Sequence, residues 1–127
     1  MPLVRASTVG ASVIASAQVA RQFDFTVAAG TTSLNSVAQL QCNNLPNGVW
    51  YVKQTNATAG GTFTPWFAVE NTAGNTPNWT EVTAAQALVP GAPIVVQQRI
   101  VPTMMSITVT APGGGPVDVT VILSAST

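Results

Sequence analysis

Residues 105–124 read MSITVTAPGGGPVDVTVILS, and this stretch decides the fold class. Apolar side chains stand at every second position before the Pro/Gly cluster and again after it: Met105, Ile107, Val109, Val117, Val119, Val121 and Leu123. Successive side chains of a strand point to opposite faces, so the pattern predicts two strands, each with one buried and one hydroxyl-covered face. We expect these strands to pair with each other as a hairpin across residues 111–116.

Further strand patterns recur at short spacing between turn clusters, which is typical of a sandwich or a barrel. Residues 23–27 alternate, whereas residues 49–52 are apolar at every position, so we expect residues 49–52 to form a central strand covered on both faces. Pro65 lacks the N–H for one ladder bond and therefore predicts an edge strand or a bulge over residues 62–70. Val and Thr, which are abundant, also prefer strands.

We therefore predict an all-β fold: an antiparallel β-sandwich, immunoglobulin-like or jelly-roll, of about eight strands over residues 19–127. Residues 1–18 lack clean alternation and helix caps, and we interpret them as an extended N-terminal arm that is ordered by packing on something else. Serine and glycine dilute the apolar part of this segment, which argues against a signal peptide.

The chain has few side chains suited to chemistry. Charged residues make up 6%, the net charge is zero and there is no histidine, the commonest general base and metal ligand. We therefore expect no enzymatic activity, no cofactor, no metal site and no small-molecule substrate. The four basic residues are too scattered for a nucleic-acid stripe, and no segment approaches the roughly 18 apolar residues that span a membrane.

Three features of the sequence could be functional sites, but a structural explanation fits each of them better. Cys42 is more typical of a small core residue than of a nucleophile. Glu70 and Glu81 bracket a loop and could serve glycoside hydrolysis, but paired acids at a hairpin base more often guard an edge. The loop between them carries oxygen ligands for calcium, although an Asn/Gly/Pro turn explains it better.

The aromatic residues offer a binding surface. Trp50 and Tyr51 lie in the doubly apolar strand and are expected in the core. Trp66 falls on the polar face of its strand, so we expect it to be exposed and to anchor a protein partner or, together with Trp79, a sugar.

Residues 63–82, FTPWFAVENTAGNTPNWTEV, resemble a hairpin of small β-sandwich virion proteins from tailed bacteriophages. There an alternating strand ends in an Asn/Gly turn and an Asn-Trp-Thr-like strand returns. Residues 107–123 are similar to the final strands of such proteins. The resemblance covers about a third of the chain and implies a head decoration (cement) protein or another virion component, commonly oligomeric and often using a terminal arm. It transfers no catalytic residue.

The neutral composition predicts a structural subunit of an assembly, and the resemblance implies a virion protein on the capsid surface, made in the host cytoplasm. It would form a homotrimer and stabilise the phage head by bridging copies of the major capsid protein. The alternative is a carbohydrate- or receptor-binding module of a phage tail or fibre. The expected partner-binding residues come from the arm and from one strand: Leu3, Val4, Arg5, Val9, Val13, Ile14 and Trp66.

Overall fold

The computed structural model describes residues 17–42, 44–69, 77–99 and 104–127. Residues 1–16 of the arm expected over residues 1–18 lie outside these ranges, and the first strand begins at Gln18, the last residue of that expected arm. The described residues form nine strands and one short 3-10 helix, in this order: β1 (Gln18–Val27), η1 (Asn35–Val37), β2 (Gln39–Gln41), β3 (Asn47–Gln54), β4 (Thr62–Val69), β5 (Asn78–Glu81), β6 (Gln86–Ala87), β7 (Pro93–Arg99), β8 (Met104–Thr110) and β9 (Val117–Ser126).

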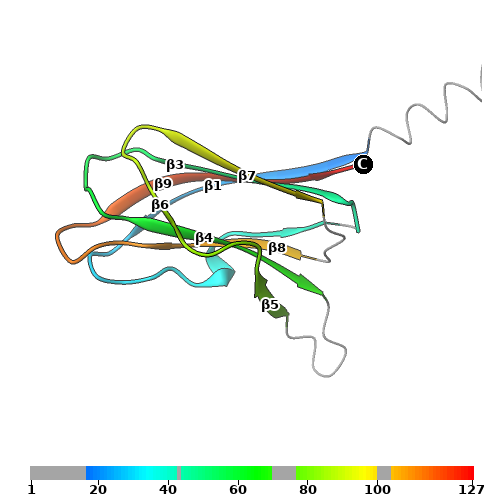
Figure 1. Cartoon of the computed structure of the whole chain (residues 1–127), viewed down its shortest axis with the longest axis horizontal. Helices are drawn as coiled ribbons and strands as arrows, with labels where there is room; N and C mark the ends of the chain where they lie inside the picture. The colour runs from blue at the N-terminus through cyan, green and yellow to red at the C-terminus, as the bar shows by residue number, and fades with distance from the viewer. Residues whose placement is uncertain (1–16, 43, 70–76, 100–103) are drawn as a thin grey trace, which may run out of the picture.

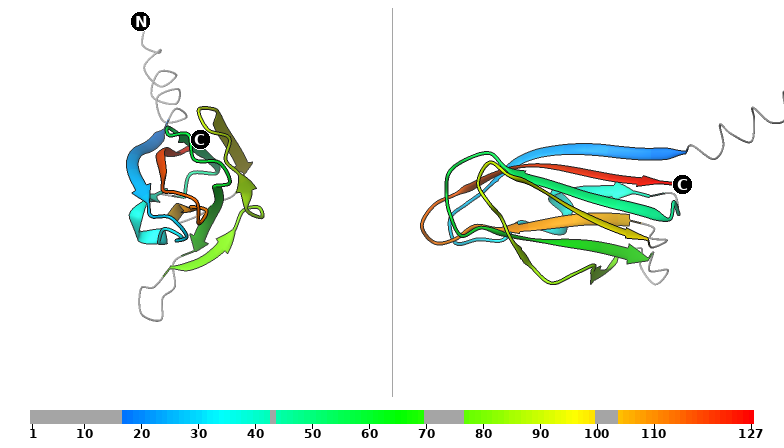
Figure 2. Two further views of the ribbon diagram at one scale, coloured as in Figure 1. Left: turned by 90° about the vertical axis from the view of Figure 1, so that its left-hand side faces the viewer. Right: turned by 45° about the horizontal axis from the view of Figure 1, so that its top comes forward.

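The strands build two antiparallel sheets that pack face to face (Figure 1). The first sheet has the order β1-β9-β3-β7, and the second has the order β2-β8-β4-β5, with β6 beside β4. Seen end-on, the two sheets enclose a common interior (Figure 2). The predicted all-β sandwich is therefore confirmed.

Strand β3 is central, as its apolar sequence predicts. It pairs with β9 on one side and with β7 on the other. Its inward side chains, among them Trp50 and Val52, are fully buried, while Val49 and Tyr51 on its outward face are half-buried. The sequence therefore predicted the position of this strand, although its outer face is less covered than expected.

The predicted hairpin of residues 105–124 is wrong. Strand β8 belongs to the second sheet and pairs with β2 and β4, whereas β9 belongs to the first sheet and pairs with β1 and β3. Residues 111–116 therefore carry the chain from one sheet to the other. Alternation determines which face of a strand is buried, and both arrangements bury the same side chains, so the pattern could not distinguish pairing from stacking.

Pro65 does not make β4 an edge strand. Strand β4 keeps an unbroken register with β8 from Thr62 to Ala68, and on its other side it pairs with β6 and then with β5. Pro65 stands at the interruption between those two partners, where its carbonyl accepts the N–H of Val82 at 2.9 Å. The missing N–H thus falls where the ladder is already broken.

The indole of Trp50 connects the two sheets through the core. Trp50 is fully buried in the first sheet, and its Nε1–H donates to the backbone carbonyls of Ser106 at 3.0 Å and Trp66 at 3.2 Å in the second. Gly48 makes room for the ring, since a Cβ at that position would lie 2.9 Å from two of its carbon atoms. A large side chain with a satisfied polar atom therefore sets the distance between the layers.

Cys42 lies in the same core. Its side chain is fully buried, as the sequence predicts, and its Sγ lies 3.5 Å from the carbonyl oxygen of Leu40. Burial penalises the thiolate and raises the pKa of this thiol from 9.0 to about 12. The thiol is therefore protonated at neutral pH and unsuited to nucleophilic attack.

Replacing Trp50 by phenylalanine should destabilise the fold by about 2 kcal/mol, because the variant loses packed ring volume and one donor that serves two backbone carbonyls of the other sheet. Urea unfolding monitored by circular dichroism measures the change. Tyr51→Phe, on the half-buried outer face of the same strand, is the matched control and should change stability by less than about 0.5 kcal/mol. Equal stability of the two variants would contradict the role of Trp50.

Native Cys42 should resist alkylation by iodoacetamide at pH 8 and react at the rate of a free thiol once the chain is unfolded in urea, as followed by mass spectrometry. Because the folded-state pKa lies above the unfolded one, the native protein holds a proton that the unfolded chain releases above pH 9. The contribution of Cys42 to stability is thus complete below about pH 9 and is lost as the pH rises toward 12. Cys42→Ser should remove this pH dependence.

Candidate interaction surfaces

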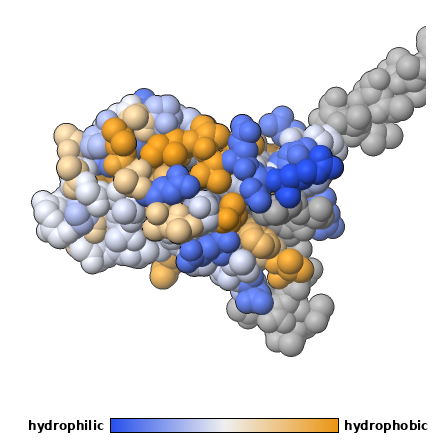
Figure 3. Space-filling model, viewed as in Figure 1, coloured by the Kyte–Doolittle hydropathy of each residue, from blue (hydrophilic) through white to orange (hydrophobic). Residues whose placement is uncertain are grey.

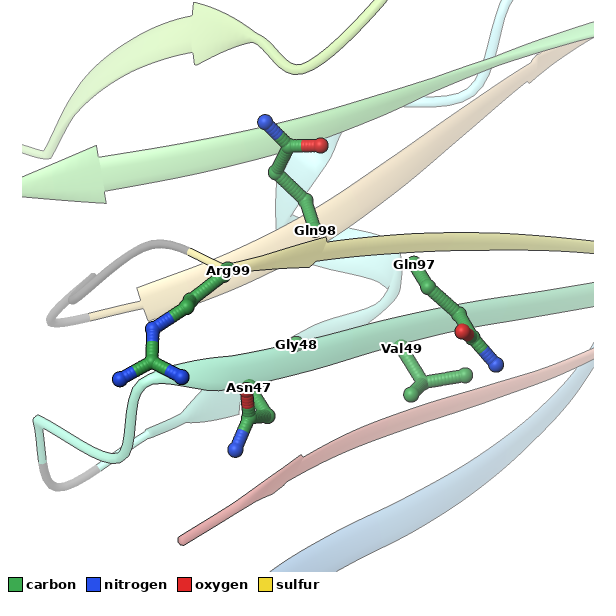
Figure 4. Close-up of a pocket in the computed structure, with 6 residues that line it drawn as sticks. All are labelled: Asn47, Gly48, Val49, Gln97, Gln98 and Arg99. Atoms are coloured by element: carbon green, nitrogen blue, oxygen red, sulfur yellow. The ribbon is translucent and has the colours of Figure 1, made fainter.

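A shallow depression of about 390 Å³ lies at one end of β3 and β7, lined by Asn47, Gly48, Val49, Gln97, Gln98 and Arg99. Figure 4 shows the side chains of Asn47 and Arg99 on the same side of the two strands, and those of Val49 and Gln97 likewise, as the β3–β7 register requires. Gln98 projects to the other side. The lining offers amide groups and one guanidinium, which recognise peptide or hydroxyl groups but supply no acid–base pair. The sequence analysis did not predict this depression. The one pattern that could have indicated it is the polar end, Gln97 to Arg99, of the otherwise apolar strand β7.

The outer face of the first sheet carries an apolar row at its middle. Tyr51 stands opposite Ile122 on one side and opposite Val95 on the other, and Val95 is 49% exposed. On the β1 side the same face is polar, because Thr26 donates to Asp118 at 2.6 Å and Thr120 donates to Asp24 at 2.6 Å. Hydroxyl groups therefore satisfy both carboxylates of this face.

The outer face of the second sheet carries two tryptophans. In the β4–β5 register Trp66 stands opposite Glu81, and Trp79 stands opposite Ala68. The two rings thus occupy diagonal positions on one face, on either side of the small and buried Ala68. Both side chains are half-buried.

Trp66 is less exposed than the sequence predicted. Its Nε1–H donates to Oγ1 of Thr108 at 2.8 Å, and Thr108 is itself buried on the outer face of β8. The indole lies against the sheet rather than standing free, because a hydroxyl on the neighbouring strand offers it an acceptor. Trp66 remains a candidate contact residue, whereas the other six predicted partner-binding residues lie in the arm, outside the described residues.

The candidate chemical sites are only partly described. Glu81 is exposed on β5, while Glu70 and most of the calcium-candidate loop lie outside the described ranges. Among the described residues, no three His, Cys, Asp or Glu side chains gather in a way that could hold a metal ion. In the same part of the chain, no helix has the length and apolar character needed to cross a membrane.

Comparison with known proteins identifies a fold and not a family. No family model and no curated protein matches the chain. The crystal structure of PirA aligns with 80% of this chain and 92% of its own at a TM-score of 0.57 and 14% identity. The viral particle of infectious bursal disease virus aligns with 88% of this chain at a TM-score of 0.52 and 12% identity, and the VP2 subviral particle of the same virus with 85% at 0.50 and 9%. The chain spans about a third of the length of those two viral chains, at 31% and 32%. These likenesses establish the β-sandwich.

Proposed function

We propose that this chain is a structural subunit of a protein assembly, and specifically a capsid decoration protein that acts without catalysis. The observation that carries the proposal is the neutrality of the surface: large hydrophobic residues are exposed over both sheets and the loops, among few charges. The exposed hydrophobics are Leu34 at 69%, Val37 at 41%, Val69 at 59%, Val89 at 54% and Val95 at 49%. Such a surface is better suited to burial against other protein than to solvent.

Two further observations support the assembly role. Both sheets of the sandwich have edge strands, and the backbone groups that lack a neighbouring strand within the described part of the chain can extend the sheet into a neighbour. The same sandwich fold occurs in the VP2 subviral particle. In the proposed mechanism, residues 1–16 reach from the start of β1 to neighbouring capsid proteins, where they add apolar contacts and backbone hydrogen bonds. A homotrimer would present three such arms to the shell.

Removal of residues 1–16 should abolish attachment to the capsid while leaving the fold intact, because the cut falls before Gln18, where β1 begins. The measurement is co-sedimentation with shells of the virus that encodes the chain, purified without this protein. Cryo-electron microscopy of the decorated shells would show the sites occupied.

The matched control is Ser7→Ala in the full-length chain, which keeps the arm and all of its expected partner-binding residues; it should retain most of the binding. Light scattering of the 13.0 kDa chain reports whether three copies associate. Undiminished co-sedimentation of the truncated chain would show that the arm is not the anchor, and absence of the chain from the particles would refute the virion role.

Carbohydrate binding is a second candidate, favoured by the diagonal placement of Trp66 and Trp79 on one face. Two neighbouring aromatic rings suit the apolar faces of a sugar. In this case Trp79→Ala should reduce the signal on a glycan array by at least about tenfold, a loss of roughly 1.4 kcal/mol. Val69→Ala, at the end of the same hairpin, should leave it unchanged. No signal from the native chain would exclude this function.

A further inference from the structure

We propose that two copies of the chain join through their β7 strands, which pair antiparallel about a two-fold axis at Val95. The two four-stranded sheets then become one continuous eight-stranded sheet. Its order is β1-β9-β3-β7 in one copy, followed by β7-β3-β9-β1 in the other. The inference concerns a contact between copies and does not depend on the decoration role. In a trimer it would be a contact between trimers, because a two-fold axis joins only two chains.

Strand β7 is the edge least protected against pairing. Among the described residues it pairs on one side only, with β3. Its five residues between Pro93 and Arg99 are uncharged, and seven residues in all are extended. A neutral and partly apolar edge of this length is a template for another strand.

The other edges are short or guarded by charge. Strand β1 carries Arg21 and Asp24, β2 has three residues, and β6 has two. Strand β5 has four residues and ends on Glu81. Charges and short length are the usual means by which proteins blunt an edge, and β7 has neither along its middle.

Both faces of β7 favour a self-complementary partner. Ile94 and Val96 face the core and are only partly buried, while Val95 extends the apolar row of Tyr51 and Ile122 on the outer face. Figure 3 shows hydrophobic surface along β7 that gives way to hydrophilic surface toward the end of the strand. Pairing about Val95 sets Val95 against its own copy and Ile94 against Val96, so apolar side chains meet on both faces.

Apolar matching selects this register over the next one. With the axis at Val96, Val95 would fall opposite Gln97 of the other copy and Ile94 opposite Gln98, so apolar side chains would meet amides on both faces.

Cysteine cross-linking tests the pairing in the full-length chain. Residues directly opposite across an antiparallel ladder have Cα atoms about 5 Å apart, within disulfide range. Val95→Cys should therefore form a disulfide-linked dimer rapidly under mild copper–phenanthroline oxidation, as read on non-reducing gels. The natural Cys42 is fully buried and does not compete.

The neighbouring variant Gln97→Cys is the register control. In the proposed pairing the two positions 97 lie four residues apart along the ladder, about 13 Å, which is too far for a disulfide. Gln22→Cys on the β1 edge reports random collision. Cross-linking of Val95→Cys at least about tenfold faster than both is the expected result. Equal rates for Val95→Cys and Gln97→Cys, or for Val95→Cys and Gln22→Cys, would overturn the proposal.

A charge at the same position gives an independent readout. Val95→Lys sets two cations against each other at the axis and should weaken self-association by about tenfold in sedimentation equilibrium, whereas Gln22→Lys should not. A native chain that stays monomeric at millimolar concentration would overturn the proposal. So would a self-association that needs residues 1–16 and shows no Val95 cross-link, because the contact between copies would then depend on the arm and not on the β7 edge. Failure of capsid binding alone would leave this contact intact.

Discussion

The indole of Trp50 is the contact on which the sandwich depends. One side chain of the first sheet reaches two backbone carbonyls of the second, so the layers are held by a directed interaction as well as by apolar burial. The ring fits only because position 48 is a glycine. The same glycine lies at the depression between β3 and β7, so the packing that joins the sheets also shapes the surface at that end.

Satisfaction of polar groups by hydroxyls and amides, rather than by ion pairs, characterises the rest of the molecule. Ser106 is buried on the outer face of β8 because Asn35 of η1 covers it, its Oγ donating to the Asn35 carbonyl at 2.9 Å. Gln54 is buried as well, and its Nε2 donates to carbonyl groups of residues 56 and 58, while its Oε1 has no hydrogen-bond partner among the described residues. A chain with few charges can therefore close its loops, but it retains little electrostatic repulsion against other copies.

The sequence predicted what depends on local pattern. Alternation and the doubly apolar residues 49–52 indicated the strands, the sandwich and the central place of β3. The sequence pattern does not show which strands pair with each other. Residues 105–110 and 117–123 stack across the core instead of pairing, and the pattern could not show this because both arrangements bury the same faces. The polar face of its strand predicts that Trp66 is exposed, and no local signal in the sequence shows that Thr108 accepts its N–H. The depression joins β3 and β7, which only tertiary pairing brings together.

An open sandwich leaves edges that a closed barrel would not have, and their sequence decides what they can do. Strand β7 begins at Pro93, which donates no ladder bond, and ends at Arg99, so its two ends discourage pairing while its middle does not. In a protein that acts as a monomer, charges along such an edge discourage pairing with other chains. Among the described residues β7 pairs with β3 alone, and the proposed pairing with a second copy would explain why the middle of this strand carries no charge beside the exposed apolar row through Val95.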